Sequence, residues 1–197
     1  MNRAVFLDRD GVINELIYYR DNGMVDSPFT LKQFRLLRGV RNAIKIINSL
    51  NFKTIVVSNQ PGIARNHFTK KTLALMDAKM EKELAKKKAF LDAVYYCPHD
   101  PKGANKRYKK VCNCRKPKPG LLLEASKRFN INLKDSYMIG DELADIQTGR
   151  NIGCKTILLG RIKCQLCKLM VDKGVFPDII VSDLLEAAKY IKREFEK

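Results

Sequence analysis

Hydrophobic residues along the chain alternate between short β-branched runs and longer stretches with helical spacing. Consecutive apolar residues, as at 3–7 and 53–58, are typical of buried strands, whereas apolar residues at every third or fourth position predict amphipathic helices. Further strands are predicted at 91–96, 136–139, 156–159 and 179–181, and helices at 39–50, after Thr69, and at 121–129, 143–151 and 184–195. This alternation favours an α/β fold with a central parallel sheet and helices on both faces.

Two segments follow neither pattern: residues 14–38 and residues 97–119. Long irregular segments in a compact domain are usually functional or disordered, and we treat residues 14–38 as a candidate specificity loop. The chain contains no internal repeat, low-complexity tract or linker. We therefore predict one domain over residues 1–197, with small loop insertions.

Composition narrows the class of protein. The 197 residues are 45% hydrophobic, too many for a disordered chain. No apolar run approaches the roughly 18 residues that span a bilayer, and the apolar N-terminal stretch stops at Asp8, short of a signal-peptide core. We expect a cytoplasmic protein with no membrane partner. The 38 Lys and Arg exceed the 21 Asp and Glu, and the net charge of +17 favours acidic ligands, either nucleic acid or phosphorylated metabolites.

Polar residues gather where the predicted strands end. In open α/β sheets ligands bind beyond the carboxyl ends of the strands, so these residues should converge on one edge of the sheet. Carboxylates held close together repel one another unless a cation lies between them, and they suit Mg²⁺ that shares a substrate phosphate. A carboxylate in such a place can also attack phosphorus. The residues concerned are Asp8-Arg9-Asp10-Gly11, Ser58-Asn59-Gln60, Arg115-Lys116-Pro117, Gly140-Asp141 and Asp145.

These groups, in this order along the chain, resemble the four motifs of the haloacid dehalogenase (HAD) superfamily of phosphatases. Within it, the sequence is similar to the heptose-bisphosphate phosphatases and the related histidinol-phosphatases over nearly its whole length. The chain has no Walker-type phosphate loop and no GxGxxG fingerprint. Each dipeptide alone is also a common turn, so the inference depends on the ordered set. The resemblance implies a three-layer Rossmann-like HAD fold without a large cap domain.

The resemblance also implies roles for individual residues. Asp8 is the nucleophile, and Asp10 is the acid and base that serves the leaving alcohol and the attacking water. Mg²⁺ is bound by the side chains of Asp8 and Asp141 and by the backbone carbonyl of Asp10. Ser58 and Lys116 stabilise the transferring phosphoryl group, as a reaction governed by positioning and charge requires.

Other residues are expected around this centre. The expected substrate contacts are Arg9, Asp21, Asn22, Gly23, Met24, Asn59, Gln60, Pro61, Arg115 and Glu142. Asp145 either orients Lys116 or the waters on the metal, or only caps a helix. Glu142 stands where heptose-bisphosphate phosphatases typically carry a lysine, and a carboxylate there should disfavour a second substrate phosphate.

Three of the six cysteines cluster with a histidine. The residues Cys97, His99, Cys112 and Cys114 offer the ligand types of a closed structural zinc site. The similar phosphatases carry the same C-x-H…C-x-C loop, so the resemblance implies Zn²⁺ bound by the zinc loop, residues 97–116. The alternative is a reduced, flexible loop whose thiols happen to cluster. The CxxC at 164–167 has no partner pair, and we assign it no role.

We therefore expect Mg²⁺-dependent hydrolysis of a small phosphate ester, a sugar phosphate similar to heptose bisphosphate, through an aspartyl-phosphate in a monomer. Histidinol phosphate remains an alternative substrate. A nucleic-acid 3′-end phosphatase fits the net charge of +17, but the sequence has no recognised DNA-binding module, so we do not expect a nucleic-acid partner. A non-catalytic basic binding protein is disfavoured by the retained Asp8, Asp10, Lys116 and Asp141.

Overall fold

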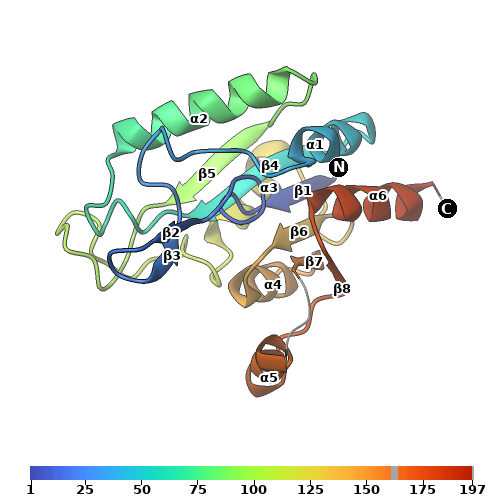
Figure 1. Cartoon of the computed structure of the whole chain (residues 1–197). Helices are drawn as coiled ribbons and strands as arrows, with labels where there is room; N and C mark the ends of the chain where they lie inside the picture. The colour runs from blue at the N-terminus through green and yellow to red at the C-terminus, as the bar shows by residue number, and fades with distance from the viewer. Residues whose placement is uncertain (161–163, 197) are drawn as a thin grey trace.

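The fold is built on a six-stranded parallel sheet (Figure 1). The computed structural model describes residues 1–160 and 164–196. The strands run in the order β5-β4-β1-β6-β7-β8, and every neighbouring pair is parallel. Their bounds are β1 (Ala4–Leu7), β4 (Lys53–Asn59), β5 (Ala93–Cys97), β6 (Tyr137–Gly140), β7 (Lys155–Leu159) and β8 (Ile179–Val181).

Helices cover both faces of this sheet, as the sequence predicts (Figure 1). The helices are α1 (Val40–Ser49), α2 (Lys70–Ala85), α3 (Gly120–Phe129), α4 (Leu143–Arg150), α5 (Cys164–Lys173) and α6 (Leu184–Phe195). Helices α1, α2 and α6 contribute to the core on one face, and α3 and α4 to clusters on the other. The predicted N-cap of α2 is confirmed, because the hydroxyl of Thr69 accepts a hydrogen bond from the backbone N–H of Thr72.

Strand β1 explains how one run of apolar residues serves two cores. Successive side chains of a strand point to opposite faces, so Val5 and Leu7 pack with α1 and α6, and Ala4 and Phe6 pack with α3. All four side chains are fully buried. A strand buried on both faces cannot alternate with polar residues, which is why the sequence shows a continuous apolar run.

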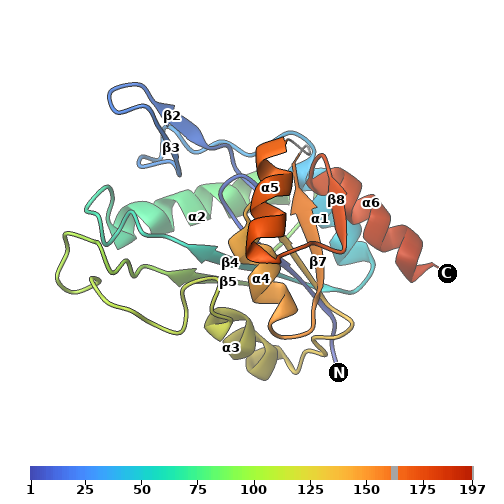
Figure 2. The same ribbon diagram turned by 90° about the horizontal axis from the view of Figure 1, so that it is seen from below.

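Two elements were not predicted. A two-stranded antiparallel hairpin, β2 (Ile17–Tyr19) and β3 (Met24–Asp26), lies within residues 14–38 and stands away from the sheet in Figure 2. Helix α5 lies at the periphery in Figure 1. The segment between β5 and α3 contains no helix or strand, as predicted. In the described parts of the chain, no helix is long and apolar enough to cross a membrane.

The order of the strands determines where chemistry can occur. Strands β4, β1 and β6 are neighbours and run in the same direction. The residues at or after their carboxyl ends are Ser58 and Asn59, Asp8, and Asp141. After β1 the chain continues to β4 on one side of β1, and it later returns to form β6 on the other side. Connections that run in opposite directions from one strand leave a ligand crevice at the carboxyl ends of the strands.

Candidate active site

Asp8 lies directly after β1 and is held by one of its two carboxylate oxygens. Its Oδ1 accepts a hydrogen bond from the backbone N–H of Arg9 at 2.7 Å, and Nζ of Lys116 lies 2.9 Å from the same atom. Within the described residues, no hydrogen bond reaches Oδ2 of Asp8. One oxygen is therefore anchored while the other stays available to a ligand.

Three carboxylates meet beside this anchored group. One ligand oxygen each from Asp8, Asp141 and Asp145 lies within 4.8 Å of the others. Burial and the charges of Asp8 and Asp145 raise the pKa of Asp141 to about 8. Oxygen ligands with this much uncompensated negative charge suit a hard cation such as Mg²⁺. The residues present therefore fit the magnesium site that the sequence predicts.

Lys116 supplies the only cation found in contact with these acids in the described parts of the chain. Its Nζ lies 2.5 Å from Oδ1 of Asp145 and 2.9 Å from Oδ1 of Asp8. Burial alone would lower the pKa of Lys116, but the charges of Asp145 and Asp8 outweigh burial and raise it. Asn59 fixes the backbone here, since its Oδ1 accepts from the Lys116 N–H at 3.0 Å. Asp145 itself is fully buried, so it holds Lys116 rather than facing a ligand.

Two glycines let the motifs approach one another. Gly11 has φ +81°, and a Cβ built there would lie 2.0 Å from Oδ2 of Asp141. A Cβ on Gly140 would lie 2.1 Å from Oδ2 of Asp145. Because a methyl group cannot occupy either place, the acidic cluster needs glycine at both positions.

A cavity of about 300 Å³ opens over these groups. Ten predicted site residues line it: Asp8, Asp10, Met24, Ser58, Asn59, Pro61, Arg115, Lys116, Asp141 and Glu142. Five further lining residues were missed: Leu16, Val25, Asp26, Ser27 and Arg65. Four of these five lie in the segment 14–38, which the sequence marks as functional without indicating which residues turn inward.

Among the described residues that line the cavity, Arg65 carries a positive charge that was not predicted. Its Nε lies 2.7 Å from Oδ2 of Asp100, and its Nη1 lies 3.7 Å from Oδ2 of Asp26. These two carboxylates join the segment after β4 to the hairpin and to the zinc loop. The proximity of Arg65 to the Ser58-Asn59-Gln60 motif was the only signal for it in the sequence.

Five predicted substrate contacts do not line the cavity. Asp21, Asn22 and Gly23 are exposed around the turn of the hairpin, because the cavity is reached by β3 and not by the turn. Arg9 and Gln60 are fully buried beside Asp10. Asp21, Asn22 and Gly23 therefore lie outside the cavity and Arg9 and Gln60 lie behind its wall, and direct contact of these five residues with a substrate stays a prediction.

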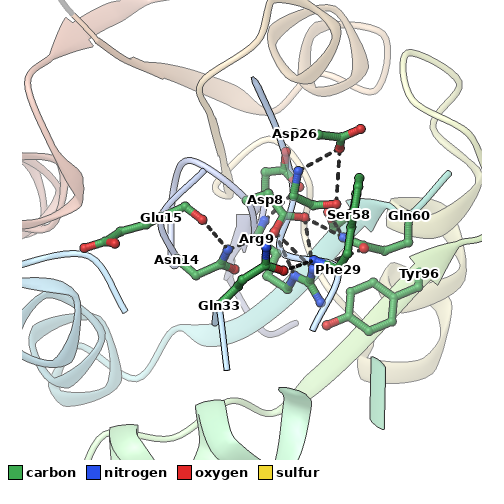
Figure 3. Close-up of polar contacts among 12 residues, drawn as sticks. Asp8, Arg9, Asn14, Glu15, Asp26, Phe29, Gln33, Ser58, Gln60 and Tyr96 are labelled. Carbon is green, nitrogen blue, oxygen red and sulfur yellow. Dashed lines mark hydrogen bonds and ion pairs between the residues drawn. The ribbon is translucent and has the colours of Figure 1, made fainter. Parts of the chain in front are cut away.

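Asp10 is enclosed by donors instead. Its Oδ1 accepts from Nη2 of Arg9 at 3.0 Å and from Nδ2 of Asn14 at 2.9 Å. Its Oδ2 accepts from Nε2 of Gln60 at 2.6 Å, and Gln60 also reaches Oγ of Ser58 at 3.2 Å. Figure 3 shows Arg9 at the centre of this group, with Asn14 on one side and Gln60 on the other.

The four predicted zinc ligands come together. The ligand atoms of Cys97, His99, Cys112 and Cys114 lie within 4.8 Å of one another. The three sulfur–sulfur distances are 3.2, 3.3 and 3.5 Å, close to the ~3.8 Å that tetrahedral Zn–S bonds of about 2.3 Å require. The cluster therefore fits Zn²⁺, and a reduced loop whose thiols happen to cluster stays the alternative.

The zinc loop is attached to the cavity at both ends. Cys97 ends β5 and pairs with Asn59 of β4, whose side chain holds the backbone of Lys116. At the other end, Nη1 of Arg115 donates to the carbonyl of His99 at 3.0 Å. The loop is therefore a support for Arg115 and Lys116.

Comparison with known proteins agrees with this geometry. Residues 113–187 match the family model described as HAD-hydrolase-like. Over 196 residues the chain is 38% identical to the D-glycero-beta-D-manno-heptose-1,7-bisphosphate 7-phosphatase of Yersinia pestis, covering 98% of this chain and 97% of that protein. The chain belongs to this phosphatase family. The phosphatase of Escherichia coli K12 is 40% identical over 157 residues, 79% of this chain and 78% of that protein.

A solved member of the heptose-bisphosphate phosphatases has the same fold. The crystal structure of D,D-heptose 1,7-bisphosphate phosphatase from B. bronchiseptica, complexed with magnesium and phosphate, matches with a TM-score of 0.79 and 28% identity. The match covers 98% of this chain and 99% of that one. The predicted HAD-type fold and superfamily membership are both confirmed.

Proposed function

We propose that this chain is a Mg²⁺-dependent phosphatase that hydrolyses a sugar phosphate of the heptose-bisphosphate kind through an aspartyl-phosphate. The observation that carries the proposal is the state of Asp8: one oxygen anchored by Lys116 and the Arg9 N–H, the other free beside the cavity. The family membership points to the same chemistry.

In the first step the free oxygen of Asp8 attacks phosphorus. The bond from phosphorus to the ester oxygen breaks, and the departing alcohol oxygen takes a proton from Asp10, which lines the same cavity. Ser58 and Lys116 stand beside Asp8 and offer a hydroxyl and an ammonium to the oxygens of the transferring group. The products of this step are the free alcohol and phosphorylated Asp8.

In the second step Asp10, now a carboxylate, takes a proton from a water molecule. The water oxygen attacks phosphorus, the bond between phosphorus and Asp8 breaks, and inorganic phosphate leaves. Asp8 returns as a carboxylate and Asp10 as an acid. One residue serves as acid and then as base, so its carboxyl must keep a defined orientation through both steps.

The metal site of this proposal uses Asp8, Asp141 and the backbone carbonyl of Asp10. When bound, Mg²⁺ supplies positive charge that neutralises the phosphate oxygens during transfer. Asp145 serves the site through Lys116, which it holds at 2.5 Å. Asp141 lies in the same acidic cluster without a cationic side chain in contact among the described residues.

The cavity wall limits the substrate. Arg65 and Arg115 present cations, whereas Glu142 presents a carboxylate next to Asp141. We infer that the part of the substrate beside Glu142 is uncharged, and that a second phosphate, where the substrate has one, faces the two arginines. A sugar with its hydroxyl groups suits the remaining polar wall of this cavity.

Zinc bound by the cysteine cluster is the structural part of the proposal. It would hold Arg115 and Lys116 in place and take no part in the chemistry. Reduced cysteines bound to zinc suit the cytoplasm, where thiols stay reduced.

The test is hydrolysis by the purified chain with and without Mg²⁺. The substrate set is heptose 1,7-bisphosphate, sugar monophosphates, histidinol phosphate and a 3′-phosphorylated oligonucleotide. We expect Mg²⁺-dependent release of phosphate from the sugar phosphates, and a loss of roughly a thousandfold or more in kcat for Asp8→Asn. The matched control is Asp172→Asn, the same change at an exposed position on α5 outside the cavity.

Two results would contradict the proposal. Substantial turnover by Asp8→Asn above the metal-free background would remove Asp8 as the nucleophile. Faster hydrolysis of the oligonucleotide or of histidinol phosphate than of every sugar phosphate would replace the substrate class.

A further inference from the structure

A fully buried guanidinium lies directly behind Asp10. Arg9 has no exposed surface, and its Nη2 lies 3.0 Å from Oδ1 of Asp10. A charge removed from water is costly unless carboxylates and hydrogen bonds surround it. Asp10 is itself needed at the cavity, where its side chain keeps 11% of its surface exposed. Arg9 therefore needs a second partner that the reaction does not use.

Asp77 on α2 supplies that partner. Its Oδ1 lies 4.0 Å from Nη1 of Arg9, on the side away from Asp10. The hydroxyl of Tyr96 on β5 donates to the same oxygen of Asp77 at 2.6 Å. The ring of Tyr96 also packs against the guanidinium, with the Arg9 Cζ 5.4 Å from the ring centroid. Figure 3 shows this ring beside Arg9.

The arrangement forms a chain of contacts that ends at the proton donor. Asp77 and Tyr96 flank one side of Arg9, where Nη1 makes no hydrogen bond within the described residues, and Nη2 on the other side binds both oxygens of Asp10. The remaining contacts of Asp10 come from two neutral amides, so Arg9 is its only charged partner in the described parts of the chain. The position of Asp10 thus depends on how Arg9 is shared between two carboxylates.

We propose that Asp77 and Tyr96 are positioning residues for this phosphatase, which act through Arg9 to set the orientation of the Asp10 carboxyl at the cavity wall. The inference rests on the proposed function, because it needs Asp10 as the group that protonates the leaving alcohol. Without the charge of Asp77, Asp10 is the one carboxylate left in contact with Arg9 among the described residues, and Arg9 draws that carboxyl away from the substrate. Neither residue touches the substrate cavity.

The choice of leaving group separates positioning from general damage. An alkyl phosphate, such as a sugar phosphate, needs a proton on its departing oxygen, whereas p-nitrophenyl phosphate has a leaving group that departs as an anion. The value of kcat/KM reports only the steps through transfer of phosphate to Asp8. A misplaced Asp10 therefore lowers kcat/KM for the alkyl ester far more than for the aryl ester.

The experiment measures kcat/KM for both esters with Mg²⁺ in Asp77→Asn and in Tyr96→Phe. Asp77→Asn should lower kcat/KM about tenfold for the sugar phosphate and about twofold or less for p-nitrophenyl phosphate. Tyr96→Phe keeps the ring, and it should also lower kcat/KM more for the sugar phosphate than for p-nitrophenyl phosphate, but by a smaller factor than Asp77→Asn. Glu83→Gln is the matched control, since it removes an acid on the same helix that pairs with Arg41 and Lys86 and not with Arg9.

Equal losses on the two esters would overturn the positioning role, and so would unchanged values for both variants. A wild-type chain that hydrolyses neither ester would instead reject the proposed function, and the positioning role with it. If Asp77→Asn does not fold, the bias in Tyr96→Phe decides the question.

Discussion

At the scale of single residues, the site depends on how closely Gly11 approaches Asp141. Substituting Gly11→Ala places a methyl carbon only 2.0 Å from Oδ2 of Asp141, far closer than van der Waals contact allows. The left-handed backbone adds about 1–2 kcal/mol of strain. We predict that Gly11→Ala loses Mg²⁺-dependent activity almost completely, as measured by phosphate release across a Mg²⁺ titration.

Gly153→Ala is the control for that prediction. Gly153 also has a positive φ, +75°, but nothing lies within 4 Å of the Cβ position. This variant should lose a similar amount of stability from backbone strain while its activity stays near wild type. Near-wild-type activity in Gly11→Ala would show that Asp141 can move without harm to the reaction.

Glu142 gives a second prediction at this scale. Its carboxylate lines the cavity beside Asp141, so it repels a phosphate at that end of the substrate. Glu142→Gln should raise the ratio of kcat/KM for a sugar bisphosphate to that for the monophosphate by roughly several-fold. This is the size expected when one repulsive charge interaction near a protein surface is removed. Glu124→Gln, an exposed acid on α3, should leave the ratio unchanged. An unchanged ratio in Glu142→Gln would contradict the inference that this carboxylate selects against a second phosphate beside it.

At the scale of elements, the zinc loop is a long segment with no helix or strand that nevertheless carries Arg115 and Lys116. Cys112→Ser removes one ligand from the cluster. We predict that bound zinc falls from about one per chain to near zero, with a lower Tm and a lower kcat, because zinc-binding energy is folding energy for such a loop. Metal analysis of protein purified without chelator measures the first effect, and thermal unfolding the second.

Cys167→Ser is the matched control, since Cys167 is exposed on α5 and outside the cluster. It should keep both zinc and activity. Less than about half a zinc per chain in the wild type would reject the zinc site, because a structural site of this ligand set binds tightly.

The sequence did not predict the β2–β3 hairpin or helix α5, and each omission has a physical reason. Each strand of the hairpin has three residues, too few to show an alternating pattern. Helix α5 exposes Leu169 and Val171, so its apolar residues do not all lie on one face, and the period is obscured. By contrast, α2 buries Leu73 and Met76 at helical spacing, and its prediction is confirmed.

At the scale of the whole molecule, the two layers of core on either side of the sheet hold the strand ends in register. Ile47 of α1 is fully buried in the larger core. Ile47→Ala should lower the free energy of unfolding by about 2–5 kcal/mol in urea denaturation. Leu75→Ala, at a side chain that is 49% exposed on α2, should change it by about 0.5 kcal/mol or less. Equal effects of the two variants would contradict this assignment of the core.

The net charge of +17 has a different meaning once the fold is known. The exposed lysines of 86–88 and 106–110 are not among the residues of the cavity, which is built around carboxylates. A positive surface raises the local concentration of anionic substrates without choosing among them. The expected absence of a nucleic-acid partner and the expected monomer stay predictions.

The sequence by itself determined the parallel α/β pattern, the four motifs in order and the three cysteines with their histidine, because strand and helix periods and motif spacing are local properties of a chain. Only the tertiary structure decided that Arg9 turns inward to Asp10 and Asp77, that Asp145 holds Lys116, and that Arg65 joins the cavity. Those outcomes depend on distances between segments far apart in the sequence, which are set by the order of the strands and the packing of helices against them.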